Sequence, residues 1–411
     1  MRVLIITHIF WPEAADFRNR ALAEELVRRG HEVTVLAPFP NYPLGRIYDG
    51  YRMSWRQWEE LDGIRVLRVP LYPDHSSSGF RRALNYGSFT LAASLLGPLL
   101  VTRPDVVFVH ASPMTLGIPA GIFRFLYGCP ILLDVVDLWP EAIQGSGMTS
   151  SRLVLAVGRL IAGYSYRVAS GIIALTGAFA EKMQQAGVPP AKMTVIPPWA
   201  DAAEFYPTAP EPEFGREFGL EGSVCIIHAG NVGPYQDIAS VLAAAELLRD
   251  EERLKFVFIG SGQHLDRMKE LATARGLTNV VFAGRFPMER MAGILAWGTA
   301  LLVNLADNPY LALTIPSKLA AYLATGRPIV AAAEGYVAEL VREHRLGVVA
   351  EPGNPESLAA AVRRLLAMSG PELDAAGRRG SELFARCFEK ESLLRRYVEL
   401  LEELAAARPT A

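Results

Sequence analysis

The feature that most constrains the fold of this 411-residue chain is a repeated alternation of short apolar runs and longer helical stretches. In the first half the runs are "VLIITHIF", "EVTVLAP", "IRVLRVPL", "DVVFVHAS", "PILLDVV", "GIIALT" and "MTVIPP". Near-continuous apolar runs that are each followed by a helix are typical of strands in a parallel sheet covered on both faces. The first half is therefore predicted to be a doubly wound α/β domain.

The same alternation begins again in the second half, with "VCIIHAGNVG", "FVFIGSG", "VVFAGRF", "ALLVNLA", "PIVAAAE" and "GVVAEPG". A chain of this length exceeds what one core usually serves, so two domains are expected. Between the two series, residues 198–215 contain four prolines, which interrupt any helix or central strand. The predicted fold class is α/β, with two doubly wound Rossmann-like domains facing a central cleft, because ligands bind at the carboxyl ends of such strands.

The boundaries predicted from this pattern are residues 1–207 for the first domain and residues 208–386 for the second. Residues 387–411 are predicted to form a helix that docks back on the first domain. This helix has an apolar stripe, which needs a surface to pack on, made of Leu393, Leu394, Tyr397, Leu400, Leu401 and Leu404.

Charge and cysteine usage limit the partners and the compartment. The formal net charge is -2, with +3 on residues 1–190 and -5 on the rest, which gives no reason to expect a nucleic-acid partner. The three cysteines are far apart and lack metal-ligand spacing, which fits a reducing cytosol. The start "MRVLIITHIF" resembles a first strand rather than a signal peptide, so a cytoplasmic location is predicted.

Two apolar stretches, residues 88–101 and 116–135, are candidates for membrane-spanning helices. Each is short or is broken by Pro, Gly or Arg124, below the roughly 20 residues that a spanning helix needs. Arg81, Arg82 and the apolar helix after them could instead form a peripheral docking surface. The other interpretation is that this helix packs in the core.

A glycine-containing turn follows the first strand of the second domain, in "HAGNVGPYQD". Gly230, Asn231 and Gly233 stand where the strand turns toward a helix that starts near Gln236. Glycine lets a phosphate approach the backbone, and helix amides favour an anion there. Many such loops need glycine for a positive φ alone, so the turn by itself leaves both interpretations open.

The segment "TIPSKLAAYLATGRP" predicts another helix start. Pro316 is acceptable in a first helical turn, Ser317 can cap it, and Lys318 then places a cation beside unpaired N–H groups. A cation is disfavoured at that end of a helix unless an anion is shared there, so Lys318 is a candidate phosphate ligand. Arg285 also follows a strand and could bind a phosphate, although a surface arginine explains it equally well.

In the first domain, candidate residues follow several strands. Glu13, Asp16 and Arg18 lie in a leader after the first strand that is predicted to be non-helical and suited to hydroxyl and anion contacts. The other interpretation of Arg18, and of Arg20, is a residue on a helix surface. His110 ends "VFVHASP", at a position that suits a residue facing a cleft. Asp137 and Glu141 occur in "LLDVVDLWPEA".

Other enzyme classes have no motif in this sequence. We find no H-E-x-x-H, no G-x-x-x-x-G-K-[ST] and no G-x-S-x-G, so zinc proteases, P-loop enzymes and α/β-hydrolases are not indicated. No D-x-D pair is placed to hold a metal, so the prediction is that no metal or other cofactor is needed.

Taken together, these motifs resemble the retaining, nucleotide-sugar-dependent glycosyltransferases of family four, with the GT-B fold, in the branch that builds bacterial O-antigen and exopolysaccharide. The resemblance runs nearly end to end, through "FWPE…FRNR", "DLWPEA", "HAGNVG", "IPSKLAAYLATGRPIV" and "GVVAEPGNPESLAAAV". It implies that the second domain holds a nucleotide diphosphate sugar and that the first holds the acceptor.

The resemblance also implies roles for single residues. Gly230, Asn231 and Gly233 would lie at the diphosphate, with Lys318 and Arg285 on its oxygens. The backbone near Phe286 would lie at the base, and His110 matches a family histidine that contacts the donor sugar. Asp137 and Glu141 fall in a family motif and are predicted to be catalytic with His110.

The sequence departs from the family pattern at four positions. Many members carry E-x(7)-E, whose second Glu binds the ribose, but these two positions are Leu313 and Ala321 here. The Arg and Lys that many relatives place after the diphosphate glycine are Asn231 and Gln236. A lost charged hydrogen bond at Ala321 would cost roughly 1.5 to 3 kcal/mol.

The predicted reaction is transfer with retention to a saccharide acceptor, usually linked to a polyprenyl diphosphate in this branch, on the inner face of the plasma membrane. Preorganised N–H groups and cations would stabilise the leaving diphosphate. Two alternatives are an epimerase or phosphorylase of similar architecture, and a non-catalytic nucleotide-sugar binder, which is suggested by Ala321.

Overall fold

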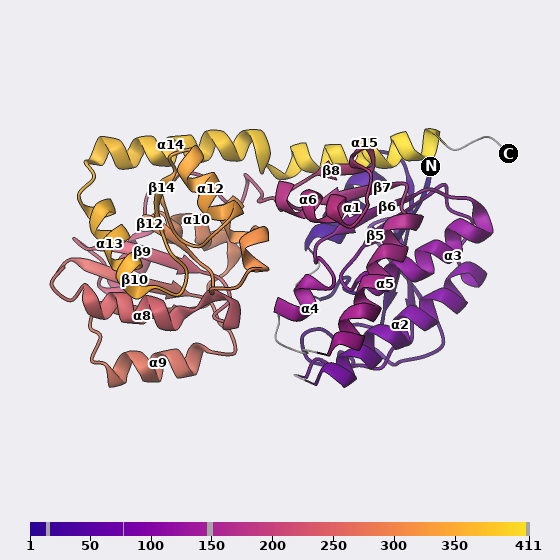
Figure 1. The fold of residues 1–411 in the computed structure, drawn as a ribbon, viewed down its shortest axis with the longest axis horizontal. Coiled ribbons are helices and arrows are strands. Elements are labelled where there is room, and N and C mark those ends of the chain that lie inside the picture. The colour runs from indigo at the N-terminus through magenta and orange to yellow at the C-terminus, as the bar shows by residue number, and fades with distance from the viewer. Residues whose placement is uncertain (14–16, 77, 146–150, 408–411) are drawn as a thin grey trace. The chain divides into compact units, whose positions relative to one another are not determined.

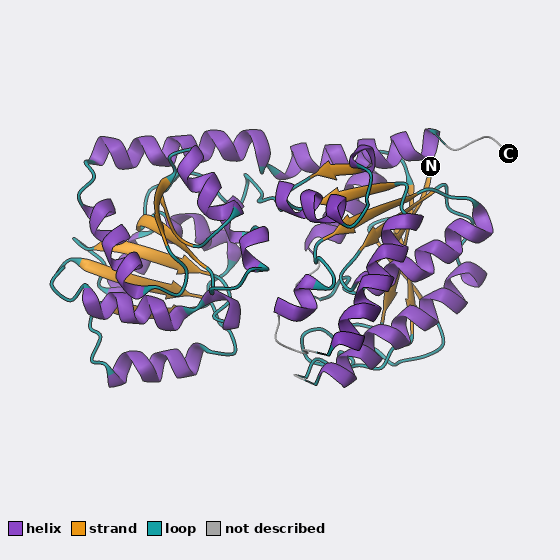
Figure 2. Ribbon diagram, in the orientation of Figure 1, coloured by secondary structure: helices purple, strands orange, loops and turns teal. Residues whose placement is uncertain are grey.

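The fold was examined in a computed structural model, which describes residues 1–13, 17–76, 78–145 and 151–407 (Figure 1). The chain divides into two compact units, here called unit 1, Met1–Ile196 with Leu394–Ala411, and unit 2, Pro197–Leu393. Each unit contains a sheet with helices packed on it (Figure 2). The predicted α/β class with two doubly wound domains is confirmed.

The sheet of unit 1 has eight strands in the order β3-β4-β2-β1-β5-β6-β7-β8. All neighbours pair in parallel except β3 and β4. Each of the seven apolar runs of the first half forms one of these strands. The bounds are β1 Arg2–Ile6, β2 Glu32–Pro38, β3 Gln57–Leu61, β4 Ile64–Val69, β5 Val106–His110, β6 Ile131–Val135, β7 Gly171–Ala174 and β8 Met193–Val195.

The edge strand β3 was not predicted. Its sequence "QWEEL" is half acidic and alternates in burial, so it lacks the apolar run of the central strands. It pairs antiparallel with β4 through a turn at Asp62 and Gly63, both of which have a positive φ. The dipeptide Asp-Gly between two alternating segments is a hairpin signal that could have revealed this strand.

Helices cover both faces of the unit 1 sheet. On one face α3 packs between α2 and α5, and the three lie side by side in Figure 1. Gly128 ends α3 in the left-handed conformation, which glycine adopts without strain. The helices of this unit are α1 Phe17–Arg28, α2 Gly79–Leu100, α3 Gly117–Tyr127, α4 Glu141–Gly145, α5 Arg152–Val168, α6 Gly177–Gln185 and α15 Lys390–Ala406.

The sheet of unit 2 has six parallel strands in the order β11-β10-β9-β12-β13-β14. Each apolar run of the second half forms one of them. The first strand in sequence, β9, therefore lies in the middle, and the loop that follows it stands at the switch point where such folds bind ligands. The bounds are β9 Val224–Ala229, β10 Leu254–Ile259, β11 Val280–Gly284, β12 Gly298–Asn304, β13 Ile329–Ala332 and β14 Gly347–Ala350.

The helices of unit 2 also lie on both faces of its sheet, with α8 packed against α13 and α11 against α14. A capping box formed by Ser369 and Glu372 begins α14, which satisfies amide groups that the helix itself leaves unpaired. The bounds are α7 Pro212–Phe218, α8 Ile238–Leu247, α9 Leu265–Ala274, α10 Met291–Leu295, α11 Lys318–Ala324, α12 Tyr336–Glu343, α13 Pro355–Leu366 and α14 Gly370–Cys387.

The division between the units falls at Ile196 and Leu393, whereas the sequence suggested residues 207 and 386. The proline-rich segment belongs to unit 2 because its backbone is paired there: the amide of Glu211 donates to the carbonyl of Gly293. The C-terminal part of α15 belongs to unit 1, where Tyr397 and Leu401 are buried. None of the described helices is both long enough and apolar enough to cross a membrane.

Candidate functional site

In unit 2, the candidate donor residues meet at the end of β9. The loop Gly230 to Gly233 is held on the neighbouring β10 loop, because Gly230 N–H donates to Ile259 O (2.8 Å) and Val232 N–H donates to Ser261 O (2.9 Å). Gly230 has a φ of +134°, which favours glycine. The loop is thus fixed by backbone bonds before any ligand arrives.

Two glycines of the loop after β10, Gly260 and Gly262, have a specific role in this packing. A Cβ on Gly260 would lie 1.9 Å from the carbonyl oxygen of Gly230. A Cβ on Gly262 would lie 2.3 Å from the carbonyl oxygen of Val232. Only glycine therefore allows the two loops to approach this closely.

Lys318 is the first residue of α11, and its side chain reaches the loop after β9. Its Nζ lies 3.1 Å from Nε2 of His228, which is fully buried in β9. A Cβ on Gly230 would lie 3.3 Å from the same Nζ, so the ammonium lies over the face of the loop that glycine leaves open. Lys318 and the glycine turn are therefore neighbours in the structure, as the family resemblance implied.

The charge of Lys318 has no carboxylate partner: no acidic oxygen in the described part of the chain lies within 4.0 Å of its Nζ. Burial lowers the pKa of Lys318 to about 7. Burial, together with the neighbouring ammonium, also lowers the pKa of His228 well below its usual range. An anion placed against Gly230 would supply the missing countercharge.

Tyr322, which the sequence motifs did not indicate, anchors α11 to the end of β9. Its hydroxyl accepts from Ala229 N–H (2.6 Å) and donates to Ala229 O (3.0 Å). It lies one helical turn after Lys318, so the bond to the end of β9 also directs the lysine toward Gly230. Ala321, where the family pattern has an acid, is buried beside it.

The capping role predicted for Ser317 is wrong. Ser317 has helical angles (φ -55°, ψ -31°) and its side chain makes no capping hydrogen bond, because capping needs an extended backbone at that residue. Pro316 precedes the helix, and its carbonyl accepts from Leu319 N–H (3.0 Å). Of Pro316, Ser317 and Lys318, it is Lys318 whose charged group lies at the glycine loop.

Of the other predicted donor residues, Gln236 lies at the glycine loop, whereas Arg285 and Phe286 follow β11. Gln236 belongs to a short turn before α8, and its Oε1 accepts from Gly233 N–H (3.3 Å), so it supports the loop. Arg285 is exposed after β11, an edge strand two positions from β9, and is not brought to Lys318. Phe286 packs edge-on against Phe214, with ring centroids 5.3 Å apart.

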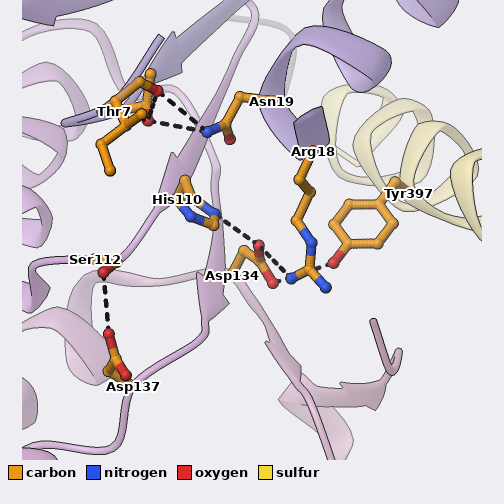
Figure 3. Close-up of polar contacts among 9 residues, drawn as sticks. Thr7, Arg18, Asn19, His110, Ser112, Asp134, Asp137 and Tyr397 are labelled. Atoms are coloured by element: carbon orange, nitrogen blue, oxygen red, sulfur yellow. Dashed lines mark hydrogen bonds and ion pairs between the residues drawn. The ribbon is translucent and has the colours of Figure 1, made fainter. Parts of the chain in front are cut away.

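In unit 1, His110 ends β5 and stands beside Asp134 of β6, its partner in the strand register (Figure 3). His110 Nδ1 lies 3.1 Å from Oδ2 of Asp134. An ionised carboxylate can only accept, so Nδ1 carries the hydrogen and Nε2 is left able to accept a proton. Asp134 thus fixes both the orientation and the tautomer of the imidazole.

Asp134 is completely buried and has three partners (Figure 3). Arg18 lies 3.4 Å from Oδ2, and the hydroxyl of Tyr397 donates to Oδ1 at 3.1 Å. Burial would raise the pKa of Asp134, but Arg18 and the hydrogen bonds from His110 and Tyr397 outweigh it and lower the pKa. Asp134 was missed because we gave weight to the polar residues after the strand; the signal was an acid inside "PILLDVV".

The expectations for the leader after β1 need correction. Arg18 is not in a non-helical loop: it lies in α1 and is 7% exposed, because it pairs with buried Asp134. Glu13 is also turned inward, where its carboxylate accepts from the amides of Asn41 (2.8 Å) and Tyr42 (2.7 Å). Asp16 lies outside the described residues.

Asp137 and Glu141 are not joined to the His110 pair. Asp137 accepts from the hydroxyl of Ser112 at 3.0 Å, which links the loops after β6 and β5 (Figure 3). Glu141 is the half-buried first residue of α4. Among the residues described, no group of three or more His, Cys, Asp and Glu side chains is arranged to hold a metal ion.

A second missed residue, Arg68, supports the loops around this site. It is fully buried in β4, where its guanidinium donates to the carbonyl oxygens of Trp11 and Pro38 and to the carboxylate of Glu59. Its signal was a charge inside the apolar run "IRVLRV". A planar group with five donors can hold several loop carbonyls at once, which an apolar side chain cannot.

Comparison with known proteins supports both halves of this description. Residues 16–199 match the model of the glycosyl transferase 4-like domain, and residues 223–368 match that of the glycosyl transferases group 1. Escherichia coli WcaI, a glycosyl transferase named for colanic acid biosynthesis, is 27% identical over 97% of this chain and 99% of its own length. Pseudomonas aeruginosa WbjE, a glycosyltransferase by name, is 27% identical over 62% of this chain and 65% of its own.

Solved structures show the same fold. Sucrose-phosphate synthase from Thermosynechococcus elongatus matches with a TM-score of 0.74 at 17% identity, over 99% of both chains. Anabaena HepE in complex with UDP and glucose matches with a TM-score of 0.70 at 17% identity, over 98% of this chain and 99% of that one. The chain therefore belongs to the group 1, GT4-like family of glycosyltransferases and has the GT-B fold.

Proposed function

We propose that this glycosyltransferase moves a sugar from a nucleotide diphosphate sugar to a lipid-linked saccharide, with retention of configuration, in the synthesis of a cell-surface polysaccharide such as O-antigen or exopolysaccharide. The observation that carries the donor assignment is Lys318, a half-buried cation held against Gly230 without a carboxylate partner. The structure of HepE with UDP and the named role of WcaI support the donor class and the pathway class.

In the proposed reaction, unit 2 stabilises the leaving diphosphate. Its charge grows as the bond to the sugar breaks, and a preorganised cation and fixed backbone amides stabilise that charge without rearrangement. Lys318 supplies the cation. The amides of Gly230, Val232 and Gly233 already donate within the protein, so the loop contributes close approach at Gly230 rather than these donors. We assign no metal to this step, because the lysine provides the countercharge.

In the proposed reaction, the catalytic contact from unit 1 is made by His110. With Nδ1 bonded to Asp134, Nε2 is the remaining ring acceptor on a side chain that is 18% exposed. We assign the acceptor to this unit and a catalytic contact to Nε2. Retention follows if the departing phosphate removes the proton of the acceptor hydroxyl on the same face, so no pair of carboxylates is needed.

The first experiment measures the melting temperature with a panel of UDP-, GDP-, ADP- and TDP-sugars in the presence of EDTA. A ligand at 100 times its Kd stabilises by about 2.7 kcal/mol, which gives a measurable shift. We expect one base to give a shift without metal. The absence of a shift with every nucleotide would contradict the donor assignment, and a shift restored only by Mn²⁺ would contradict metal independence.

Lys318→Met tests the observation that carries the proposal. Loss of a charge-assisted hydrogen bond weakens binding by roughly 1.5 to 3 kcal/mol, or about 10- to 150-fold in Kd. The matched control is Lys269→Met, an exposed lysine on α9 of the same unit, which should bind as the parent does. His110→Ala should keep the thermal shift and lose turnover; full turnover would remove His110 from the reaction.

A further inference from the structure

The surface of unit 1 formed by α2, α3 and α5 carries an unusual share of apolar side chains. Of the 21 exposed large hydrophobic side chains in the described residues, 11 lie on these three helices. The helices lie side by side, with α3 in the middle (Figure 1). An exposed apolar surface of this extent on one set of helices marks a place of interaction rather than scattered surface residues.

The exposed large apolar side chains of α2 form one stripe: Phe80, Leu84, Leu91, Leu95 and Leu99. Their spacing of four or seven residues places them on one side of the helix. The opposite side already packs against the unit, where Phe89 and Ala93 are buried. The stripe is therefore a second apolar face, which core packing does not explain.

Helix α5 has its small residues inside and its large apolar residues outside. Gly158 and Ala162 are buried, whereas Leu153 and Leu160 are 74% and 73% exposed. A Cβ on Gly158 would lie 3.3 Å from Ile143, so α5 packs closely on α4 through a glycine. A helix that only covered a core would place its leucines on the buried side.

The charges on these helices have one sign. Their sequences contain six arginines, two in α2, one in α3 and three in α5, and no aspartate or glutamate. Arg152, Arg159 and Arg167 are exposed and take part in none of the ion pairs between described residues. Apolar stripes bordered only by cations match the surface of a bilayer that contains anionic phospholipid.

We propose that this arginine-bordered apolar face, formed by the outer sides of α2, α3 and α5, docks the enzyme on the surface of an anionic membrane. Leucine and phenylalanine side chains would enter the interface between headgroups and acyl chains, and the arginines would bind lipid phosphates. A symmetric dimer through the same face would bring the acid-free helices of two copies together, which like-charge repulsion opposes.

The position of the face relates it to the candidate site. Helix α5 packs on the segment that carries Trp139 and Pro140, just after Asp137. Helix α2 reaches the end of β1, where Asn85 bonds His8 (2.8 Å). Docking would thus bring the edge of unit 1 near the lipid that carries the acceptor. The link between docking and a lipid-linked acceptor rests on the proposed function, whereas the docking itself does not.

The test is co-sedimentation of the full chain with vesicles of phosphatidylcholine, with or without phosphatidylglycerol. We expect binding to the anionic vesicles that weakens with salt. Arg152→Gln with Arg159→Gln should lower the partition coefficient about 25-fold, because each cation near such a surface contributes roughly fivefold. Leu91→Ser with Leu95→Ser should lower it at least as much, since apolar burial adds to binding.

The control is Leu247→Ser with Arg386→Gln, which changes an exposed leucine and an exposed arginine of unit 2 and should bind as the parent does. Equal vesicle binding by all variants would overturn the proposal, as would no binding to anionic vesicles. So would a dimer, seen by light scattering, that is lost only in the leucine variant. The thermal shift with a nucleotide sugar should be unchanged in every variant, so failure of docking and failure of the donor assignment are distinguishable.

Discussion

The charged groups of the two units are handled in opposite ways. In unit 1, Arg18, Asp134, His110 and Tyr397 form a closed set, in which a fully buried carboxylate is bonded on both oxygens. In unit 2, Lys318 and His228 lie together, and no carboxylate of the described residues lies within 4.0 Å of the ammonium. A closed set fixes the geometry of one imidazole, whereas an uncompensated cation is completed only by a ligand.

The contrast assigns different tasks to the two sites. Removing the carboxylate of the closed set breaks contacts with three buried side chains, so its effects should appear first in stability. Removing the open cation relieves a desolvated charge, so its effects should appear in binding.

Asp134→Asn should give the largest loss of stability, since it removes the buried carboxylate that Arg18, His110 and Tyr397 all contact. Breaking a buried pair in this way costs about 3 to 5 kcal/mol. The measurement is the free energy of unfolding of unit 1 in urea. The control is Asp105→Asn, which breaks a partly exposed pair with Arg2 and should cost about 1 kcal/mol or less. Equal losses in the two variants would remove the contrast.

Affinity for a nucleotide sugar should fall as pH rises above about 7, because the ammonium of Lys318 is then lost from the free protein. The limit is about tenfold per pH unit, and the diphosphate of a nucleotide sugar has no group that titrates in this range. Titration calorimetry from pH 6 to 9 measures it. Lys318→Met should bind weakly at every pH, and a parent protein with pH-independent affinity would contradict the open-cation description.

The same pKa has a second consequence, of opposite direction, in the absence of ligand. The unfolded chain binds a proton at this lysine up to its ordinary pKa of 10.5, whereas the folded protein releases it near 7. Stability therefore rises with pH where the unfolded state holds more protons, so Lys318 contributes a rise above pH 7. In Lys318→Met this contribution to the stability of unit 2 should be absent.

Tyr397→Phe should have the smallest effect on stability. It removes one hydrogen bond to Asp134 while Arg18 and His110 remain, and a typical net loss is about 0.5 to 1.5 kcal/mol. If α15 helps to orient His110 through Asp134, turnover should fall while the nucleotide-induced thermal shift is kept. Normal turnover with the same loss of stability would make the contact purely structural.

Local patterns were enough to predict every central strand, because each is a short apolar run of nearly uniform composition. They missed β3, whose place depends on pairing with β4 rather than on burial. They also marked Gly230 and Lys318 as separate phosphate candidates, and the family resemblance implied that the two share one site. They failed for Arg18 and Glu13, whose side chains turn inward.

Periodicity and residues close in the chain were enough to predict the fold class, the two sheets and the glycine turn after β9, because these are local features. Which charges pair depends on the tertiary structure. Asp134 meets Tyr397 across 263 positions of sequence, and Lys318 meets His228 across 90. Such pairs are set by strand register and by where a helix docks, which no local pattern encodes.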